Sequence, residues 1–465
     1  MPPVRLPRAR THRFAAACAL AGAVLACDGS APAGRPLPIV LVSIDTLNPQ
    51  NLRAYDERAE ALPHLDAFAR QATTFRGAYS TASWTLPSHA SMLTGLYPDR
   101  HGATDPRRRI AQDARTLAEV LQDAGYETAG FTDEGYVDAE FGFGRGFRIY
   151  NGASSGRGVG SGDLPRQGRP HENHGAALFD RAVSFLEARP ADSRPLFLFV
   201  QTYSVHDYFK VRRAVEGVDS TNREKLATRF RGCIGGSLEC SRDQWDVMER
   251  LYQAEVAHLD VAFGRLLAAL DTAGMADAVV AVVSDHGEGF SPGRRRIHHG
   301  GRLHADVIRI PFLLRVPGAS AEIVDEPVSL VDVMPILLDR AGVDAPPGLD
   351  GNALVAHAPS RSVFAMEHHF RWERGRRVAE RESRAEPLET AVIDGNQWLI
   401  AGESGAELYD MAADADQTAP AGLDAPAAAE LLQQVVRRVR PLTEEAGALP
   451  NAELRAQLEA LGYTE

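Results

Sequence analysis

Lysine is almost absent from this sequence of 465 residues, in which Lys210 and Lys225 are the two examples. A cationic site elsewhere in the chain must therefore use arginine or histidine. The formal net charge of −12 argues against a general nucleic-acid surface, which would be basic. Apolar residues make up 44% of the chain, more than a disordered chain has. We expect a globular protein that does not bind nucleic acid.

Long apolar segments are also lacking, since no stretch after the N-terminus offers the about 18 uninterrupted apolar residues of a membrane-spanning helix. The first 27 residues are typical of an export signal, with arginines before a short apolar stretch at 14–26. The sequence VLAC at residues 24–27 resembles a bacterial lipoprotein cleavage site, and plain signal cleavage is the alternative. Residues 28–36 suit a tether. We expect an exported periplasmic, cell-envelope or secreted protein, in contact with a membrane only through a lipid on Cys27.

Cysteine is scarce as well, with four in the chain. Cys18 lies in the apolar part of the signal, and Cys27 lies at its end. The remaining pair, Cys233 and Cys240, flanks a glycine-containing loop, and in an exported protein this spacing favours a local disulfide. Two unpaired thiols are the alternative.

Apolar runs alternate with amphipathic segments over residues 37–345. The runs predict buried strands of a parallel sheet at 37–44, 128–131, 196–202, 278–284 and 311–316. Helical patterns lie at 64–71, 80–95, 117–125, 247–273 and 328–342. This alternation predicts an α/β fold with a mostly parallel central sheet flanked by helices.

The pattern changes from about residue 346. Residues 357–387 are rich in Arg and Glu and show little periodicity, whereas 390–400 and 406–409 predict short strands. Residues 427–439 predict an amphipathic helix with a proline before it. We expect residues 346–465 to form a smaller α+β subdomain.

Two of the predicted strands end in residues that can bind a metal ion. Asp45 follows the first strand, and Asp285 and His286 follow the strand at 278–284. Because the carboxyl ends of parallel strands meet at one edge of a sheet, these three side chains can reach one ion. Oxygen ligands suit Ca²⁺, whereas a histidine ligand shifts the preference towards Mn²⁺ or Zn²⁺. We predict one divalent ion and leave its identity open.

Between these strands, residues 80–95 read STASWTLPSHASMLTG. Pro87 fits an early helical position, so Thr85 would lie at a helix N-terminus, where backbone N–H groups favour an anion. A threonine hydroxyl is a poor nucleophile until metal coordination lowers its pKa. We therefore predict that Thr85 is both a metal ligand and the nucleophile in displacement at sulfur or phosphorus.

Several segments in order resemble the sulfatase branch of the alkaline-phosphatase superfamily. Between Leu37 and about Asp414 they include LPIVLVSIDTL, TLPSHASMLTGLYPDRHG, VVSDHGEGF and HHGGRLHADVIRIPFLLRVPG. The resemblance implies an alkaline-phosphatase-like fold with residues 37–345 as the catalytic domain. It also implies hydrolysis of a small-molecule or glycan ester, and a metal ion held by Asp45, Asp285 and His286.

The sequence departs from the family at the nucleophile. Sulfatases carry Cys/Ser-x-Pro-x-Arg, in which the Cys or Ser becomes formylglycine, and the matching segment here runs from Thr85 to His89. Formylglycine is therefore not expected, and hydrolysis of a phosphoester is as credible as release of sulfate.

The family's lysines at the anion are missing too, so histidine and arginine must replace them. The resemblance implies that His206 and His299 face the ester, where an imidazolium can donate to an oxygen or protonate the leaving group. We also predict that Arg302 contacts the anion and that His89 takes part in catalysis.

Two other functions stay open. A transferase could move a phospho-group onto a cell-envelope glycan or lipid, although such enzymes usually carry several membrane helices. An inactive binding protein on the same fold would explain the missing lysines and cysteine, although the expected metal ligands are retained. Nothing in the sequence identifies the substrate or the oligomeric state.

Overall fold

The structure is a computed structural model. It describes residues 36–151, 153–154, 174–190, 193–208, 215, 228, 232, 241–290, 298–353, 361–373, 376–442 and 454. Cys27, Cys233 and Cys240 lie outside these residues, as do the predicted export signal and all but the last residue of the tether. The signal, lipid-anchor and disulfide predictions therefore stay predictions. Residues 36–465 form one compact unit.

A nine-stranded sheet forms the centre of this unit, in the order β10-β2-β9-β8-β1-β7-β4-β5-β6. Its middle strands β8, β1, β7 and β4 pair in parallel, with Ile39 opposite both Val279 and Phe197. The residues of β1, β7 and β8 are all buried, which explains their continuous apolar sequence. The strands span Ile39–Ile44 (β1), Thr73–Phe75 (β2), Glu127–Thr132 (β4), Ile149–Tyr150 (β5), Ala153–Ser154 (β6), Leu196–Thr202 (β7), Val279–Val283 (β8), Phe312–Arg315 (β9) and Ile323–Val324 (β10).

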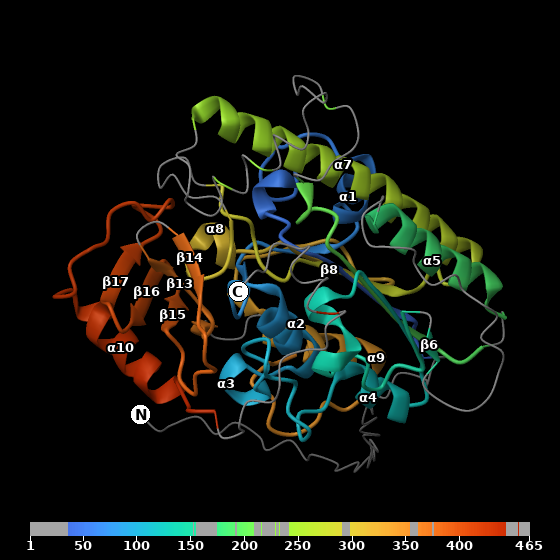
Figure 1. Cartoon of the computed structure of the whole chain (residues 1–465). Coiled ribbons are helices and arrows are strands. Elements are labelled where there is room, and N and C mark those ends of the chain that lie inside the picture. Colours follow the sequence, from blue (N-terminus) through green and yellow to red (C-terminus); the bar gives the residue numbers. More distant parts are fainter. Residues whose placement is uncertain are drawn as a thin grey trace, which may run out of the picture. The chain divides into compact units, whose positions relative to one another are not determined.

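Helices cover both faces of the sheet (Figure 1). On one face lie α1 (Pro63–Ala69), α5 (His174–Ala188) and α7 (Arg242–Thr272). On the other lie α2 (Thr85–Thr94), α4 (Leu117–Asp123) and α9 (Val333–Ala341). Two short helices, α3 (Pro98–His101) and α8 (Ala305–Ile308), and a two-stranded sheet of β3 (Ala78–Tyr79) and β11 (Val328–Ser329) complete this part. The predicted α/β class is confirmed.

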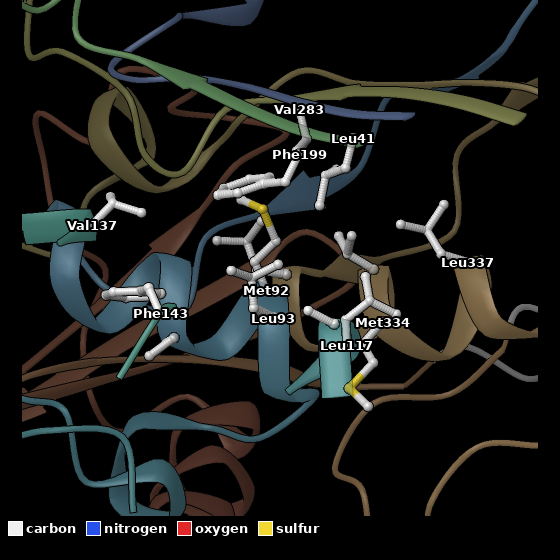
Figure 2. Close-up of a cluster of buried hydrophobic side chains, with 14 of the residues drawn as sticks. Leu41, Met92, Leu93, Leu117, Val137, Phe143, Phe199, Val283, Met334 and Leu337 are labelled. Atoms are coloured by element: carbon white, nitrogen blue, oxygen red, sulfur yellow. The ribbon is translucent and has the colours of Figure 1, made fainter. Parts of the chain in front are cut away.

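Alternate residues of each central strand belong to two separate cores. Leu41, Phe199 and Val283 pack with Met92 of α2 and with side chains of α4 and α9 (Figure 2). The neighbouring residue Val42 packs instead in the cluster that α1, α5 and α7 complete. This period of two fixes the sheet between its helical layers and so fixes the strand ends that carry the site.

An antiparallel sheet forms the C-terminal part, in the order β12-β15-β16-β17, and α10 (Pro426–Arg438) packs against it. Its strands span Val363–Glu367 (β12), Glu389–Asp394 (β15), Gln397–Gly402 (β16) and Gly405–Asp410 (β17), and a hairpin joins Phe370–Glu373 (β13) to Arg376–Ala379 (β14). The stretch predicted as one strand at 390–400 is thus a hairpin, which turns at Gly395 with φ of 56°. Among the described helices, none is long and apolar enough to cross a membrane.

Candidate active site

Asp45, Asp285 and His286 meet where β1 and β8 end. All three are fully buried, and one ligand atom of each lies within 4.8 Å of the others. His286 Nε2 lies 3.3 Å from Asp285 Oδ2 and 4.0 Å from Asp45 Oδ1. The structure therefore brings together the three side chains that the sequence predicted as metal ligands.

Two carboxylate oxygens of this group fit a cation. Asp45 Oδ1 and Asp285 Oδ2 are buried without a hydrogen-bond partner in the described part of the chain. Burial, followed by the charge of Asp285, raises the pKa of Asp45 well above its usual range. Buried carboxylates without donors are costly unless a positive charge lies beside them. The donor set of Asp45, Asp285 and His286 therefore suits a divalent metal ion.

Thr85 is the first residue of α2 and lies against this group. Its Oγ1 donates a hydrogen bond to Asp45 Oδ2 at 3.1 Å and lies 3.5 Å from His286 Nε2. The preceding Trp84 is extended, so the helix starts at Thr85, as Pro87 predicted. Thr85 is fully buried.

His89 lies one turn further along α2 and is also fully buried. Its Nδ1 lies 3.0 Å from the carbonyl oxygen of Thr85 and 3.3 Å from Asp285 Oδ2, and its Nε2 lies 2.9 Å from Ser43 Oγ. Burial lowers the pKa of His89, which favours the neutral ring. These contacts join α2 to β1 and to Asp285, one of the predicted metal ligands, and the part of His89 in catalysis stays a prediction.

The other two predicted histidines lie beside His286. The ring of His299 is 4.5 Å from that of His286 and 5.0 Å from that of His206, measured between centroids. His206 follows β7, the strand next to β1, and its Nδ1 lies 3.2 Å from Asp207 Oδ1. Burial and the neighbouring histidines lower the pKa of His299 well below its usual range. Both imidazoles are thus brought to the edge where Thr85 lies.

Arg302 lies beside the turn that carries His298 and His299. It is buried, and its Nη2 donates to Asp306 Oδ2 at 2.7 Å and to the carbonyl oxygen of His298 at 3.3 Å. The same nitrogen lies against Gly289, where a β-carbon would approach it to 1.7 Å. These contacts support that turn, whereas Nε and Nη1 of Arg302 have no hydrogen-bond partner within the described residues, so its contact with substrate stays a prediction.

Glu288, His298 and Arg377 lie at the site but were not assigned a role from the sequence. Glu288 Oε2 lies 2.8 Å from His299 Nδ1, and His298 Nδ1 lies 3.7 Å from Glu288 Oε1. Burial raises the pKa of Glu288 to about 8, against the charges of Arg302 and Arg377. The Asp-His-Gly-Glu spacing was a usable signal for Glu288.

Arg377 comes from β14 of the C-terminal part. Its guanidinium lies 4.5 Å from the centroid of the Phe370 ring, and its Nη1 donates to the carbonyl oxygen of His299 at 3.5 Å. It contributes to the lowered pKa of both His298 and His299, after burial. A positive charge therefore lies next to the histidine turn in a protein that lacks lysine there.

Comparisons with known proteins show which family this chain resembles. Residues 38–343, more than half of the chain, match the family Sulfatase. An ulvan-active sulfatase of Formosa agariphila is 26% identical over 310 residues, which cover 63% of this chain and 59% of that protein.

Solved structures share the fold. A phosphonate monoester hydrolase of Agrobacterium radiobacter superposes with a TM-score of 0.66 at 19% identity, over 93% of this chain and 98% of that one. A protein solved with its substrate D-glucosamine-2-N,6-O-disulfate gives 0.65 at 19% identity, over 87% of this chain and 97% of that one. The resemblance seen in the sequence is confirmed, and the chain belongs to the sulfatase family of ester hydrolases.

Proposed function

We propose that this protein hydrolyses a sulfate or phosphate ester with the unmodified hydroxyl of Thr85 as nucleophile. The observation that carries the proposal is the position of Thr85 Oγ1. This atom donates a hydrogen bond to Asp45 Oδ2 and lies 3.5 Å from His286 Nε2. A divalent ion bound by Asp45, Asp285 and His286 would lower the pKa of this hydroxyl and neutralise charge on the ester.

The residues around Thr85 support attack on an anionic ester. Asp45 accepts the hydroxyl hydrogen and so orients Oγ1. Thr85 begins α2, and the backbone N–H groups at the N-terminus of that helix favour a negatively charged group. The ring of His206 lies 5.0 Å from that of His299, and we propose that His206 donates a proton to the leaving oxygen. Arg377 supplies the cation that lysine supplies in typical sulfatases.

The relatives define the substrate classes to test. One acts on ulvan, another was solved with D-glucosamine-2-N,6-O-disulfate, and a third is a phosphonate monoester hydrolase. Threonine at position 85 cannot follow the formylglycine route that the family's Cys or Ser follows. We therefore propose that phosphate esters are substrates on an equal footing with sulfate esters.

The test compares wild type with Thr85→Ala and Thr85→Ser on an aryl sulfate, a phosphate monoester and a phosphodiester, each with Ca²⁺, Mn²⁺ or Zn²⁺. We expect Thr85→Ala to lower kcat/KM by about 10³-fold or more, since it removes the nucleophile, and Thr85→Ser to keep part of the activity. Full activity of Thr85→Ala, in a variant with the wild-type circular dichroism spectrum, would refute the role of Thr85. Transfer to an added glycan or lipid in preference to water would identify a transferase.

A further inference from the structure

We propose that the protein binds a second divalent cation, held by Glu288, His298 and His299 beside the Asp45 group. One ligand atom from each of these three side chains lies within 4.8 Å of the others, as in the Asp45 group. The inference shares its location with the proposed ester hydrolysis and deepens it, because it makes the centre binuclear.

The separations between the ligand atoms suit a small cation. Glu288 Oε2 and His299 Nδ1 are 2.8 Å apart, and Glu288 Oε1 and His298 Nδ1 are 3.7 Å apart. Ligand atoms at the usual distances from a tetrahedral Zn²⁺ lie about 3.4 Å from one another. The two measured separations lie on either side of this value, and the third lies within the 4.8 Å limit of the group.

The burial of the Glu288 carboxylate is a second, independent observation that points to a cation. Glu288 is 1% exposed, yet its Oε1 has no hydrogen-bond donor within the described residues. The 3.7 Å gap to His298 Nδ1 is too long for a hydrogen bond. An acceptor buried in this way costs free energy unless a cation or a donor meets it.

The backbone holds His298 in an uncommon conformation. Its φ is 92°, which a residue with a β-carbon rarely adopts. Gly300 and Gly301, which follow His299, also have positive φ. Arg302 Nη2 donates a hydrogen bond to the carbonyl oxygen of His298 and so supports this turn. The turn therefore places His298 and His299 beside the carboxylate of Glu288.

The ligand chemistry distinguishes the two groups. The Asp45 group offers two carboxylates and one imidazole, whereas the Glu288 group offers one carboxylate and two imidazoles. Imidazole favours Zn²⁺ or Mn²⁺ over Ca²⁺, so the second ion would belong to the first-row transition metals or zinc. The rings of His286 and His299, one from each group, are 4.5 Å apart between centroids. The two groups are therefore adjacent, and two ions held in adjacent sites can stabilise both the attacking and the leaving oxygen of a displaced ester when they lie about 3.5–4 Å apart.

The test is metal stoichiometry. The full chain is stripped with a chelator, reloaded with Zn²⁺, separated from unbound metal and measured for zinc per chain by mass spectrometry. We expect two ions in wild type, one in the double variant Glu288→Gln/His298→Gln, and one in Asp285→Asn. His304→Gln is the matched control, since His304 is a buried histidine of the same segment that lies by Tyr409, and it should keep two.

A single ion in wild type, or two ions in the Glu288→Gln/His298→Gln variant, would overturn the proposal and leave the cluster as a hydrogen-bonded pair that orients His299. If that variant fails to fold, anomalous scattering at the zinc edge from crystals of wild type decides the matter, with two peaks expected. The readout is separate from the Thr85→Ala assay. Two ions with a fully active Thr85→Ala would reject Thr85 and keep the second site, and one ion with an inactive Thr85→Ala would do the reverse.

Discussion

His89 stands where the family motif has arginine, and this difference changes which residues contact the predicted metal ligands. The family motif places arginine here, a long cation with five donors. Histidine is shorter, and at this position its two nitrogens already contact Asp285, Ser43 and the backbone of Thr85. We therefore expect its ring to fix the orientation of the Asp285 carboxylate, a predicted metal ligand.

We predict that His89→Gln weakens metal binding and lowers kcat, each by about 10- to 100-fold, which is typical for a residue that orients a metal ligand. Metal titration of the stripped protein measures the first effect without reference to activity. His101→Gln is the control, because His101 is equally buried and bonds to Ser91 and Pro87 of the same helix. Equal losses in both variants would mean that any change in this core perturbs the site.

At the level of single residues, the sequence predicted those that follow strands better than those that come from turns. Asp45, Asp285 and His286 could be placed together because parallel strands end at one edge of a sheet. Arg302 could not be placed, since its direction depends on the turn at His298 and on the ion pair with Asp306. Arg377 gave no signal, because its stretch of the sequence has no apolar period.

Among the elements, α1 depends on a residue of another helix. It begins at Pro63 without a side-chain cap of its own. Asp260 of α7 accepts hydrogen bonds from the backbone N–H groups of Leu65 at 2.7 Å and His64 at 3.2 Å. Asp260 is 1% exposed, and it satisfies two of the N–H groups that a helix leaves without a partner at its N-terminus.

We predict that Asp260→Ala lowers the free energy of unfolding by about 2 kcal/mol, because it leaves buried helix-terminal donors unsatisfied. Urea unfolding measures the change. Asp246→Ala, an exposed site on the same helix, should stay within about 0.5 kcal/mol of wild type. A loss at Asp246 as large as that at Asp260 would show that α7 responds to any lost aspartate.

Element prediction succeeded where burial is two-sided and failed in the C-terminal part. The central strands read as apolar runs because both faces are covered. Strand β12 was missed since it ends in Glu367, a buried charge that reads as surface sequence. Glu367 is accommodated by the backbone N–H groups of Gly301, His369 and Phe370, which are contacts that only the folded chain supplies.

For the whole molecule, an ion-pair network joins α10 of the C-terminal part to α3 and to Asp350. Arg438 of α10 donates to Asp99 Oδ2 at 2.9 Å and to Asp350 Oδ2 at 3.3 Å, and its guanidinium lies 4.4 Å from the Tyr97 ring centroid. Burial raises the pKa of Asp99 to about 6, and the charge of Arg438 only partly opposes this shift. The junction therefore contains a carboxyl group whose pKa is higher in the folded than in the unfolded protein.

The sign of the resulting pH dependence follows from proton uptake. Because the folded pKa of about 6 exceeds the ordinary value of 3.8, the folded protein takes up this proton first as pH falls. The contribution of Asp99 to the free energy of unfolding therefore rises as pH falls through 6, and it is complete below the unfolded value. A shift of this size amounts to about 1 kcal/mol between pH 7 and pH 5.

Asp99→Asn removes this titration while keeping a polar partner for Arg438. We predict that the free energy of unfolding of wild type minus that of Asp99→Asn increases by about 1 kcal/mol from pH 7 to pH 5. Urea unfolding at several pH values measures the difference, in which contributions shared by both proteins cancel. A difference that stays flat, or that falls on acidification, would mean that Arg438 holds Asp99 ionised in the folded state, and the junction would then be an ordinary ion pair.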